Sequence, residues 1–432
     1  MNNDPTTSAV SVLVATGLCS LWGIFWALKQ GRMISATAGL HLNALLLVAI
    51  GPIIYVLTDP LPERLPFFQT VSFITNVAEY FLIGYVFWSV IEWFLIVQPN
   101  RIIASRRLDI QSISMTLLVI LSFMSLVGYL AAQLAFATSG IGTIIIVMKN
   151  FMYPCLLSIL LRTRWRHPSD VFIAVVWSGC VLILSSASPW RSDLVVSGFC
   201  LLLYISIRIP RLTIPLLAVG LMLFWIVLPT LQFKKENHDE FSESPLSAIV
   251  TSQKLNIDER TSLLFEFAGT RLNYTREMAY AERGVELGMT NRLEGQSYSA
   301  SVYQLIPRVI WLNKPSYNHN NNFTIPREIG LLAWNDPGTS WGLNAYAESI
   351  INFPVEYLVL FVPLLFLLFH FIELYALKLM KTSSSKFLLS SSLFFLTISL
   401  VGLVNLGTFI LWCIIFLAIV DFILVNIERK TI

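Results

Sequence analysis

Residues 355–380 read VEYLVLFVPLLFLLFHFIELYALKLM, and stretches of this kind decide the fold class of the chain. The only charged residues in the stretch are Glu356, Glu373 and Lys378. A bilayer core about 30 Å thick needs roughly 20 apolar residues per helix, because lipid offers the backbone no hydrogen-bonding partner. The stretch therefore predicts a membrane-spanning helix.

The same apolar pattern recurs along the chain. Of its 432 residues, 56% are hydrophobic and 13% are charged, and the mean hydropathy is +0.70, which excludes an ordinary soluble domain. We predict an all-α polytopic membrane protein with about eleven transmembrane helices. The predicted spans are 8–28, 36–58, 71–97, 113–137, 141–161, 171–188, 194–208, 212–233, 355–380, 387–406 and 409–427. We place the turn between the last two at Asn405-Leu406-Gly407.

One long polar interval divides these spans. The predicted parts are an N-terminal bundle of about eight helices (1–233), a large loop (234–354) and a C-terminal bundle of about three helices (355–432). Lys and Arg gather in alternate short connections, which indicates the cytoplasmic side. Examples are Lys29, Arg32, Arg101, Arg162 and Arg208. This pattern predicts that the large loop is extracytoplasmic. The first apolar run lacks the basic region of a signal peptide, so we expect it to remain as a membrane helix.

Several function classes lack support in the sequence. The net charge of +3 is too small to indicate a nucleic-acid partner. All five cysteines lie in apolar segments, so the polar loop offers neither a disulfide framework nor a thiolate metal site. The chain has no His-Glu-x-x-His motif and no glycine-rich phosphate loop. We therefore predict no metal and no cofactor.

Five charged residues fall inside predicted spans: Glu79, Glu92, Lys149, Glu373 and Asp421. Charges are costly in lipid, and they often mark a transport pathway. A transporter would hold them in pairs at mid-membrane. We favour the interpretation that they make polar contacts between helices or reach toward the membrane surface.

The polar loop holds the candidate site. From Ile257 to about Gly284 the pattern predicts an amphipathic helix at the membrane surface, on which Arg276, Tyr280 and Arg283 share one face. Residues 307–337 are rich in Pro and Asn and predict an irregular loop. Arg forks suit phosphate, and aromatic faces suit sugar rings, so the loop fits a phosphorylated, glycosylated lipid. A solvated surface rich in Arg and Tyr is the alternative. The loop cations are Arg271, Arg276, Arg283, Arg292, Arg308, Lys314 and Arg327.

Two loop segments carry a family resemblance. Ile306-Pro307-Arg308, followed by Trp311 and Lys314-Pro315, resembles a signature of the bacterial oligosaccharide repeat-unit polymerases (O-antigen polymerases, Wzy type). The segment from Gly342 to Pro354 resembles the entry of that family into its next membrane helix, with Glu348, Asn352 and Phe353 in place. Pro354 stands where the family usually has Gly, and Ile350 where an aromatic residue is common. Leu343 stands where the related O-antigen ligases tend to have His, which weighs against a ligase.

The resemblance implies a GT-C-like, metal-independent glycosyltransferase in the bacterial cytoplasmic membrane. Such an enzyme moves a glycan from a polyprenyl diphosphate to a second lipid-linked repeat unit, and a flippase and a chain-length regulator are its expected partners. It implies Glu348 as the catalytic base or as a carboxylate that orients the acceptor, with His319 in reserve, and Arg308 and Lys314 at the diphosphate. The expected substrate-binding residues are Arg271, Arg276, Trp311, Lys314, Arg327, Tyr346 and Asn352. The alternatives are a ligase-like glycan transferase, a flippase or transporter for lipid-linked sugars, and a structural subunit of an envelope complex.

Overall fold

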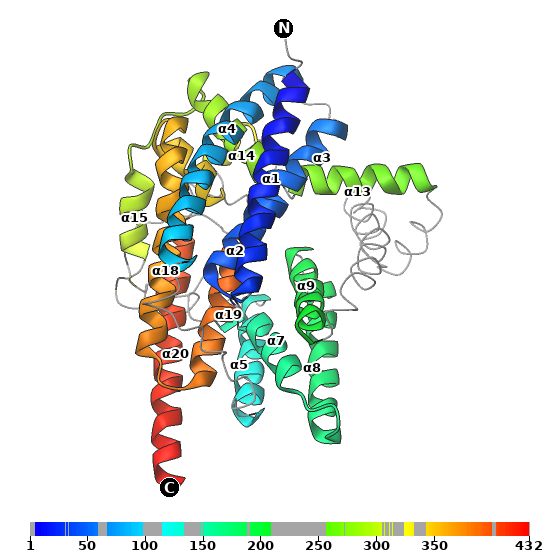
Figure 1. Cartoon of the computed structure of the whole chain (residues 1–432), viewed down its shortest axis with the longest axis vertical. Coiled ribbons are helices and arrows are strands. Elements are labelled where there is room, and N and C mark those ends of the chain that lie inside the picture. The colour runs from blue at the N-terminus through cyan, green and yellow to red at the C-terminus, as the bar shows by residue number, and fades with distance from the viewer. Residues whose placement is uncertain are drawn as a thin grey trace.

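The computed structural model of the chain describes residues 5–30, 32, 34–58, 67–97, 115–133, 148–149, 151–187, 191–208, 256–271, 273–304, 306, 311, 313, 324–331, 343–399 and 403–431. Every regular element formed by these residues is a helix (Figure 1). Five of the described helices are long and apolar enough to cross a membrane, and four shorter apolar helices accompany them. The chain is thus a helical membrane protein. The predicted span 212–233 lies outside the described residues.

The five long helices coincide with predicted spans 8–28, 36–58, 71–97, 171–188 and 355–380. They are α1 (Pro5–Lys29), the continuous run of α2 (Ala36–Asn43), η1 (Ala44–Ile50) and α3 (Gly51–Thr58), α4 (Phe67–Glu92) with its extension η2 (Trp93–Val97), α8 (Pro168–Ala187) and α18 (Leu358–Leu379). Helix α4 packs against both α1 and α18. The predicted spans coincide with these helices because a membrane helix is selected by its apolar length, which is a local property of the sequence.

The second of these runs is not a regular α-helix. Its middle, η1, is π-helical, and the N–H of Gly51 donates to the carbonyl of Leu46, five residues back. Such turns widen the helix and displace carbonyls from the usual pattern, and they are frequent at functional sites.

Helices α4 and α18 approach closely at Gly84. A Cβ atom on Gly84 would lie 2.6 Å from the carbonyl oxygen of Leu358. Only glycine allows the two backbones to come this close.

The remaining apolar helices include α5 (Met115–Gln133), α7 (Met152–Arg162), α9 (Arg191–Arg208), α19 (Ser383–Ser399) and α20 (Leu403–Thr431). The predicted turn at Asn405-Leu406-Gly407 is wrong, because these residues lie inside α20. Hydropathy is nearly continuous from 387 to 427, so composition alone does not locate the break. Helix α19 ends at Ser399 and packs against α2 and α20.

Four of the five charged residues predicted inside spans make the expected polar contacts. Glu92 hydrogen-bonds to His41, Glu373 accepts from the N–H of Ala36, and Lys149 lies 5.3 Å from the ring centre of Tyr129. Asp421 accepts from the N–H groups of Lys381 and Thr382, just before α19 begins. Glu79 is different, because its side chain is exposed on α4.

The polar interval contains five described helices: α13 (Ile257–Arg271), α14 (Tyr274–Glu286), α15 (Gln296–Gln304), α16 (Ile325–Glu328) and α17 (Ala345–Asn352). The prediction of one amphipathic helix from Ile257 to Gly284 is wrong, because Asn273 separates two helices and caps the second. The predicted irregular stretch 307–337 contains the short helix α16. In Figure 1, α13 starts beside α3 and extends sideways away from the bundle, and α14 lies near the end of the molecule that holds the N-terminus.

Candidate functional site

Helix α14 is the element around which the polar interval is organised. Its first turn is closed by Asn273, whose Oδ1 accepts from the N–H of Arg276 at 2.7 Å. The hydroxyl of Thr275 donates to the carbonyl of Val48 in η1 at 2.9 Å, and both partners are buried. Helix α14 also packs against α4 and α17. The polar interval is therefore docked directly onto the membrane bundle.

Two arginines of α14 stack on tyrosine rings. The guanidinium of Arg276 lies 5.6 Å from the ring centre of Tyr55 and 5.1 Å from that of Tyr280. The guanidinium of Arg283 lies 5.0 Å from the centre of the same Tyr280 ring. The prediction that Arg276, Tyr280 and Arg283 share one helix face is confirmed. Stacking leaves the in-plane N–H donors of a guanidinium directed away from the ring, where they can meet an anion.

Helix α17 carries Glu348, which was expected at the mouth of a membrane helix. The structure places it in a separate short helix that ends at Asn352, before Pro354 and the 3₁₀ turn η7 (Val355–Tyr357) lead into α18. Asn344 caps α17, since its Oδ1 accepts from the N–H groups of Tyr346 and Ala347 at 3.0 Å each. Glu348 is 1% exposed and lies in the first turn, where the helix dipole favours a carboxylate.

Helices α14 and α17 are joined by a buried hydrogen-bond pair. Oε2 of Glu277 accepts from the main-chain N–H of Asn344 at 3.1 Å and from its side-chain amide at 2.6 Å. Because Asn344 also caps α17, one side chain fixes the start of α17 on α14. Glu348 and the arginine-bearing helix are thereby held in one packed unit.

Arg292 holds the other end of α17. Its guanidinium donates to the carbonyls of Ile350 and Phe353 at 2.8 and 2.7 Å and to the carboxylate of Glu282 at 3.3 Å. The last carbonyls of a helix lack partners within the helix, and a cation near them is favourable. Arg292, counted above among the general loop cations, therefore has a structural role at the end of α17.

Asn352 and Tyr346, two predicted substrate-binding residues, are buried. The amide of Asn352 accepts from the N–H of Gly295 at 3.0 Å and donates to Ser297 at 2.6 Å and to the carbonyl of Glu348 at 2.7 Å. Tyr346 is fully buried and meets Phe81 of α4 edge to face, with ring centres 5.0 Å apart. These contacts position α17, and a contact of either residue with substrate stays a prediction.

The other predicted site residues are more scattered. Trp311 is half-buried and meets Tyr303 edge to face at 5.8 Å. Arg327 lies in α16, and Arg271 is the last residue of α13. Arg308, Lys314 and His319 lie outside the described residues. The pairing of Arg308 with Glu348 therefore stays a prediction.

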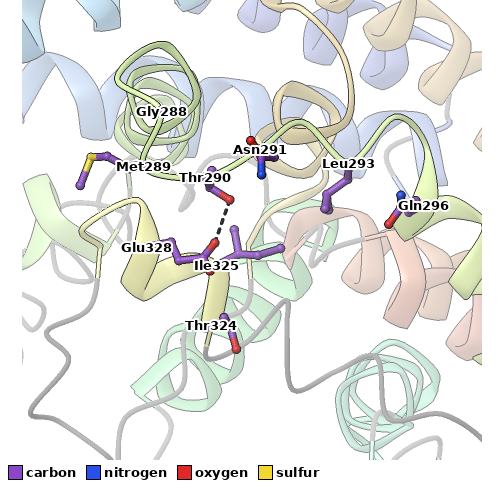
Figure 2. Close-up of a pocket in the computed structure, with 9 residues that line it drawn as sticks. All are labelled: Gly288, Met289, Thr290, Asn291, Leu293, Gln296, Thr324, Ile325 and Glu328. Carbon is purple, nitrogen blue, oxygen red and sulfur yellow. Dashed lines mark hydrogen bonds between the residues drawn. The ribbon is translucent and has the colours of Figure 1, made fainter.

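A pocket of about 320 Å³ opens between the segment that follows α14, the start of α15, and α16 (Figure 2). Thr290 donates to Glu328 across it at 2.8 Å, and Asn291 and Gln296 also line it. None of the predicted site residues that the structure describes lines this pocket, although Arg327 adjoins Glu328 in sequence. Among the residues that the structure describes, no three His, Cys, Asp or Glu side chains gather to hold a metal ion.

Burial sets the protonation of several groups around α14. It raises the pKa of the phenols of Tyr274 and Tyr346, so both remain neutral donors at physiological pH. It also raises the pKa of Glu282, and the neighbouring Arg292 offsets only part of this increase. The surroundings of α17 thus combine neutral phenols with fixed guanidinium charges.

A second polar cluster lies inside the helix bundle. Nε2 of His41 in α2 donates to Glu92 of α4 at 2.9 Å, and Nδ1 accepts from the hydroxyl of Tyr85. Nearby, Arg32 donates to Nδ1 of His370 in α18 at 3.5 Å. His41 is fully buried, and a Cβ atom on Gly23 of α1 would lie 2.4 Å from its Nδ1. These residues form two hydrogen-bonded groups inside the bundle, His41 with Tyr85 and Glu92, and Arg32 with His370.

The fold and these two clusters define the class of the chain as a helical membrane protein with a polar interval packed onto its bundle. No protein-family model, curated protein or solved structure matches the chain. The residues that sequence analysis missed as site builders are Glu277, Glu282 and Arg292. Their partners lie from 10 to 67 positions away in the chain, so no local pattern announces them.

Proposed function

We propose that this chain is a glycosyltransferase that polymerises lipid-linked oligosaccharides on the outer side of the cytoplasmic membrane. The observation that carries the proposal is the packing of α14, with its stacked arginines, against α17, which bears Glu348. The sequence motifs around Arg308 and Glu348 add to it. The donor is a glycan on a polyprenyl diphosphate, and the acceptor is a second lipid-linked repeat unit.

The chemistry requires a base and a cationic surface. The acceptor hydroxyl oxygen bonds to the anomeric carbon of the donor while the bond from that carbon to the diphosphate oxygen breaks. The diphosphate leaves with the electron pair, and cations that stabilise it lower the barrier. Glu348 accepts the hydroxyl proton, and Arg276, Arg283 and Arg308 stabilise the diphosphate.

Replacement of Glu348 tests this proposal. In cells that lack the endogenous gene and carry the variant, Glu348→Gln should reduce the ladder of glycan lengths to a single repeat unit. The same result is expected for cells in which the gene is deleted. Glu356→Gln is the matched control, because it makes the same change at an exposed carboxylate eight residues further on. With equal protein levels in the membrane, long-chain polymer in Glu348→Gln would refute the assignment.

A transporter for lipid-linked sugars is the second candidate, and the His41–Glu92 pair in the membrane bundle favours it. Ionisable pairs buried between membrane helices serve as proton relays in transporters. The distinguishing test is translocation of a fluorescent polyprenyl-diphosphate sugar in proteoliposomes under a pH gradient. Transport that stops in His41→Gln, together with an unchanged glycan ladder in Glu348→Gln cells, would replace the polymerase proposal.

A further inference from the structure

A second pocket lies between α1, α4 and α14, and neither stacked arginine lines it. Its volume is about 470 Å³. Helix α4 supplies most of its wall through residues spaced three and four apart, which share one helix face. The residues lining the pocket are Ser8, Ser72, Phe73, Thr75, Asn76, Glu79 and Glu286.

The exposure of this helix face is unusual for a membrane segment. Ser72 and Glu79 are exposed, although both lie in a helix that is long and apolar enough to cross a membrane. The opposite face of the same helix, with Val71, Ile74 and Ala78, is fully buried in the bundle. A charged side chain in a spanning helix nearly always faces protein or water rather than lipid. The polar stripe of α4 therefore opens into water at the end of the bundle.

Glu79 supports this interpretation. In the part of the chain that the structure describes, its carboxylate makes no ion pair, unlike Glu92 on the same helix. Glu286, which faces the same pocket from α14, is also exposed. Among the described residues that line the pocket, no cation lies between the two carboxylates, so both can accept hydrogen bonds from a ligand.

The lining chemistry indicates the ligand class. Hydroxyl, amide and carboxylate groups can exchange hydrogen bonds with the many hydroxyls of a sugar, and the ring of Phe73 can cover its apolar face. None of the lining residues that the structure describes is cationic, so this set of residues does not suit a phosphate. Arg276 and Arg283, by contrast, stack on tyrosines and suit an anion. Helix α14 thus carries both the stacked arginines and one residue that lines this polar pocket.

We propose that this second pocket is a saccharide subsite that holds a neutral or amino sugar of the acceptor glycan. Asn76 and Glu79 bind its hydroxyl groups, and Glu286 binds a further hydroxyl or an amine. The assignment to the acceptor rests on the proposed polymerase function, whereas the binding of a sugar does not.

Saturation-transfer NMR on the full-length protein in nanodiscs tests the subsite. The probes are glucose, N-acetylglucosamine and glucosamine, with inorganic pyrophosphate for comparison. We expect transfer to at least one sugar, and we expect Asn76→Ala combined with Glu79→Gln to weaken binding by about tenfold or more. Glu356→Gln should leave the signal unchanged. Thermal unfolding of the double variant is the control for its folding.

The outcomes separate the subsite from the polymerase. Sugar binding that is equal in wild type and double variant, or no transfer to any of the three sugars, would overturn the subsite. Sugar binding lost in the double variant but kept in Glu348→Gln would support it. A glycan ladder that is indifferent to Glu348, together with sugar binding that depends on Asn76 and Glu79, would keep the subsite and remove the polymerase.

Discussion

Glu277 of α14 accepts two hydrogen bonds from Asn344, one from the main-chain N–H at 3.1 Å and one from the side-chain amide at 2.6 Å. Both residues are buried, at 6% and 1% exposure. The same Asn344 caps α17 through its Oδ1. A single asparagine therefore sets both the start of α17 and its position on α14.

Asn344→Ala is expected to destabilise the protein by about 2–4 kcal/mol. The change removes the helix cap and one donor to the buried Glu277 carboxylate, the side-chain amide, while the main-chain N–H of residue 344 remains. Asn344→Ser keeps a capping oxygen and should lose less. Thermal unfolding in detergent, followed by tryptophan fluorescence, measures the three proteins. Equal midpoints for wild type and Asn344→Ala would contradict the linking role of this residue.

Arg292→Lys is expected to loosen the end of α17. Lysine keeps the charge but cannot reach two carbonyls and a carboxylate in the geometry of a guanidinium fork. The N–H of Leu293 donates to the carbonyl of Ile351, so its hydrogen exchange reports on this region. We expect faster exchange there in Arg292→Lys. Arg164 is exposed, so Arg164→Lys should show the same exchange at Leu293 as wild type. Unchanged exchange in Arg292→Lys would refute the role of Arg292 at the end of α17.

The pH dependence of stability should carry the signature of Glu282. Burial raises its pKa in the folded state above the unfolded value. Such a group contributes stability below its unfolded pKa and loses that contribution as the pH rises through the folded pKa. The free energy of unfolding of Glu282→Gln should therefore decline less between pH 4 and pH 7 than that of wild type, as measured by denaturation at each pH. Identical pH profiles would show that Glu282 titrates equally in both states.

Gly84→Ala should weaken the α4–α18 contact. The new methyl group would lie 2.6 Å from the carbonyl oxygen of Leu358, and a backbone atom cannot move aside as a flexible side chain can. We expect a loss of about 1–3 kcal/mol. Gly179→Ala in α8 is the control, because no atom lies within 4 Å of its added Cβ and alanine favours a helix. Two variants of equal stability would contradict the close approach.

The membrane helices could be predicted from the sequence because apolar length is local information. The break between α19 and α20 could not, since hydropathy stays high through Asn405 and gives no local signal for it. The division of the predicted helix at Asn273 did have a local signal, because asparagine is a typical N-cap residue. In the structure its side chain accepts from the N–H of Arg276.

The candidate site divides in the same way. The shared face of Arg276, Tyr280 and Arg283 follows from helical spacing and was predicted. The bond between Glu277 and Asn344 spans 67 positions, so only the fold brings the two together. The pocket beside Glu79 was also missed. Most of the residues that line it belong to predicted span 71–97, and hydropathy does not show which face of a span other helices cover.

The π-helical turn η1 sets the rotational register of everything that follows it in its span. One residue fewer in Ala44–Ile50 would turn Tyr55 by about 100° around the helix axis. Tyr55 would then swing away from Arg276, and the carbonyl of Val48 would no longer meet the hydroxyl of Thr275. An apparently superfluous residue inside a membrane helix thus keeps the polar interval aligned with the bundle beneath it.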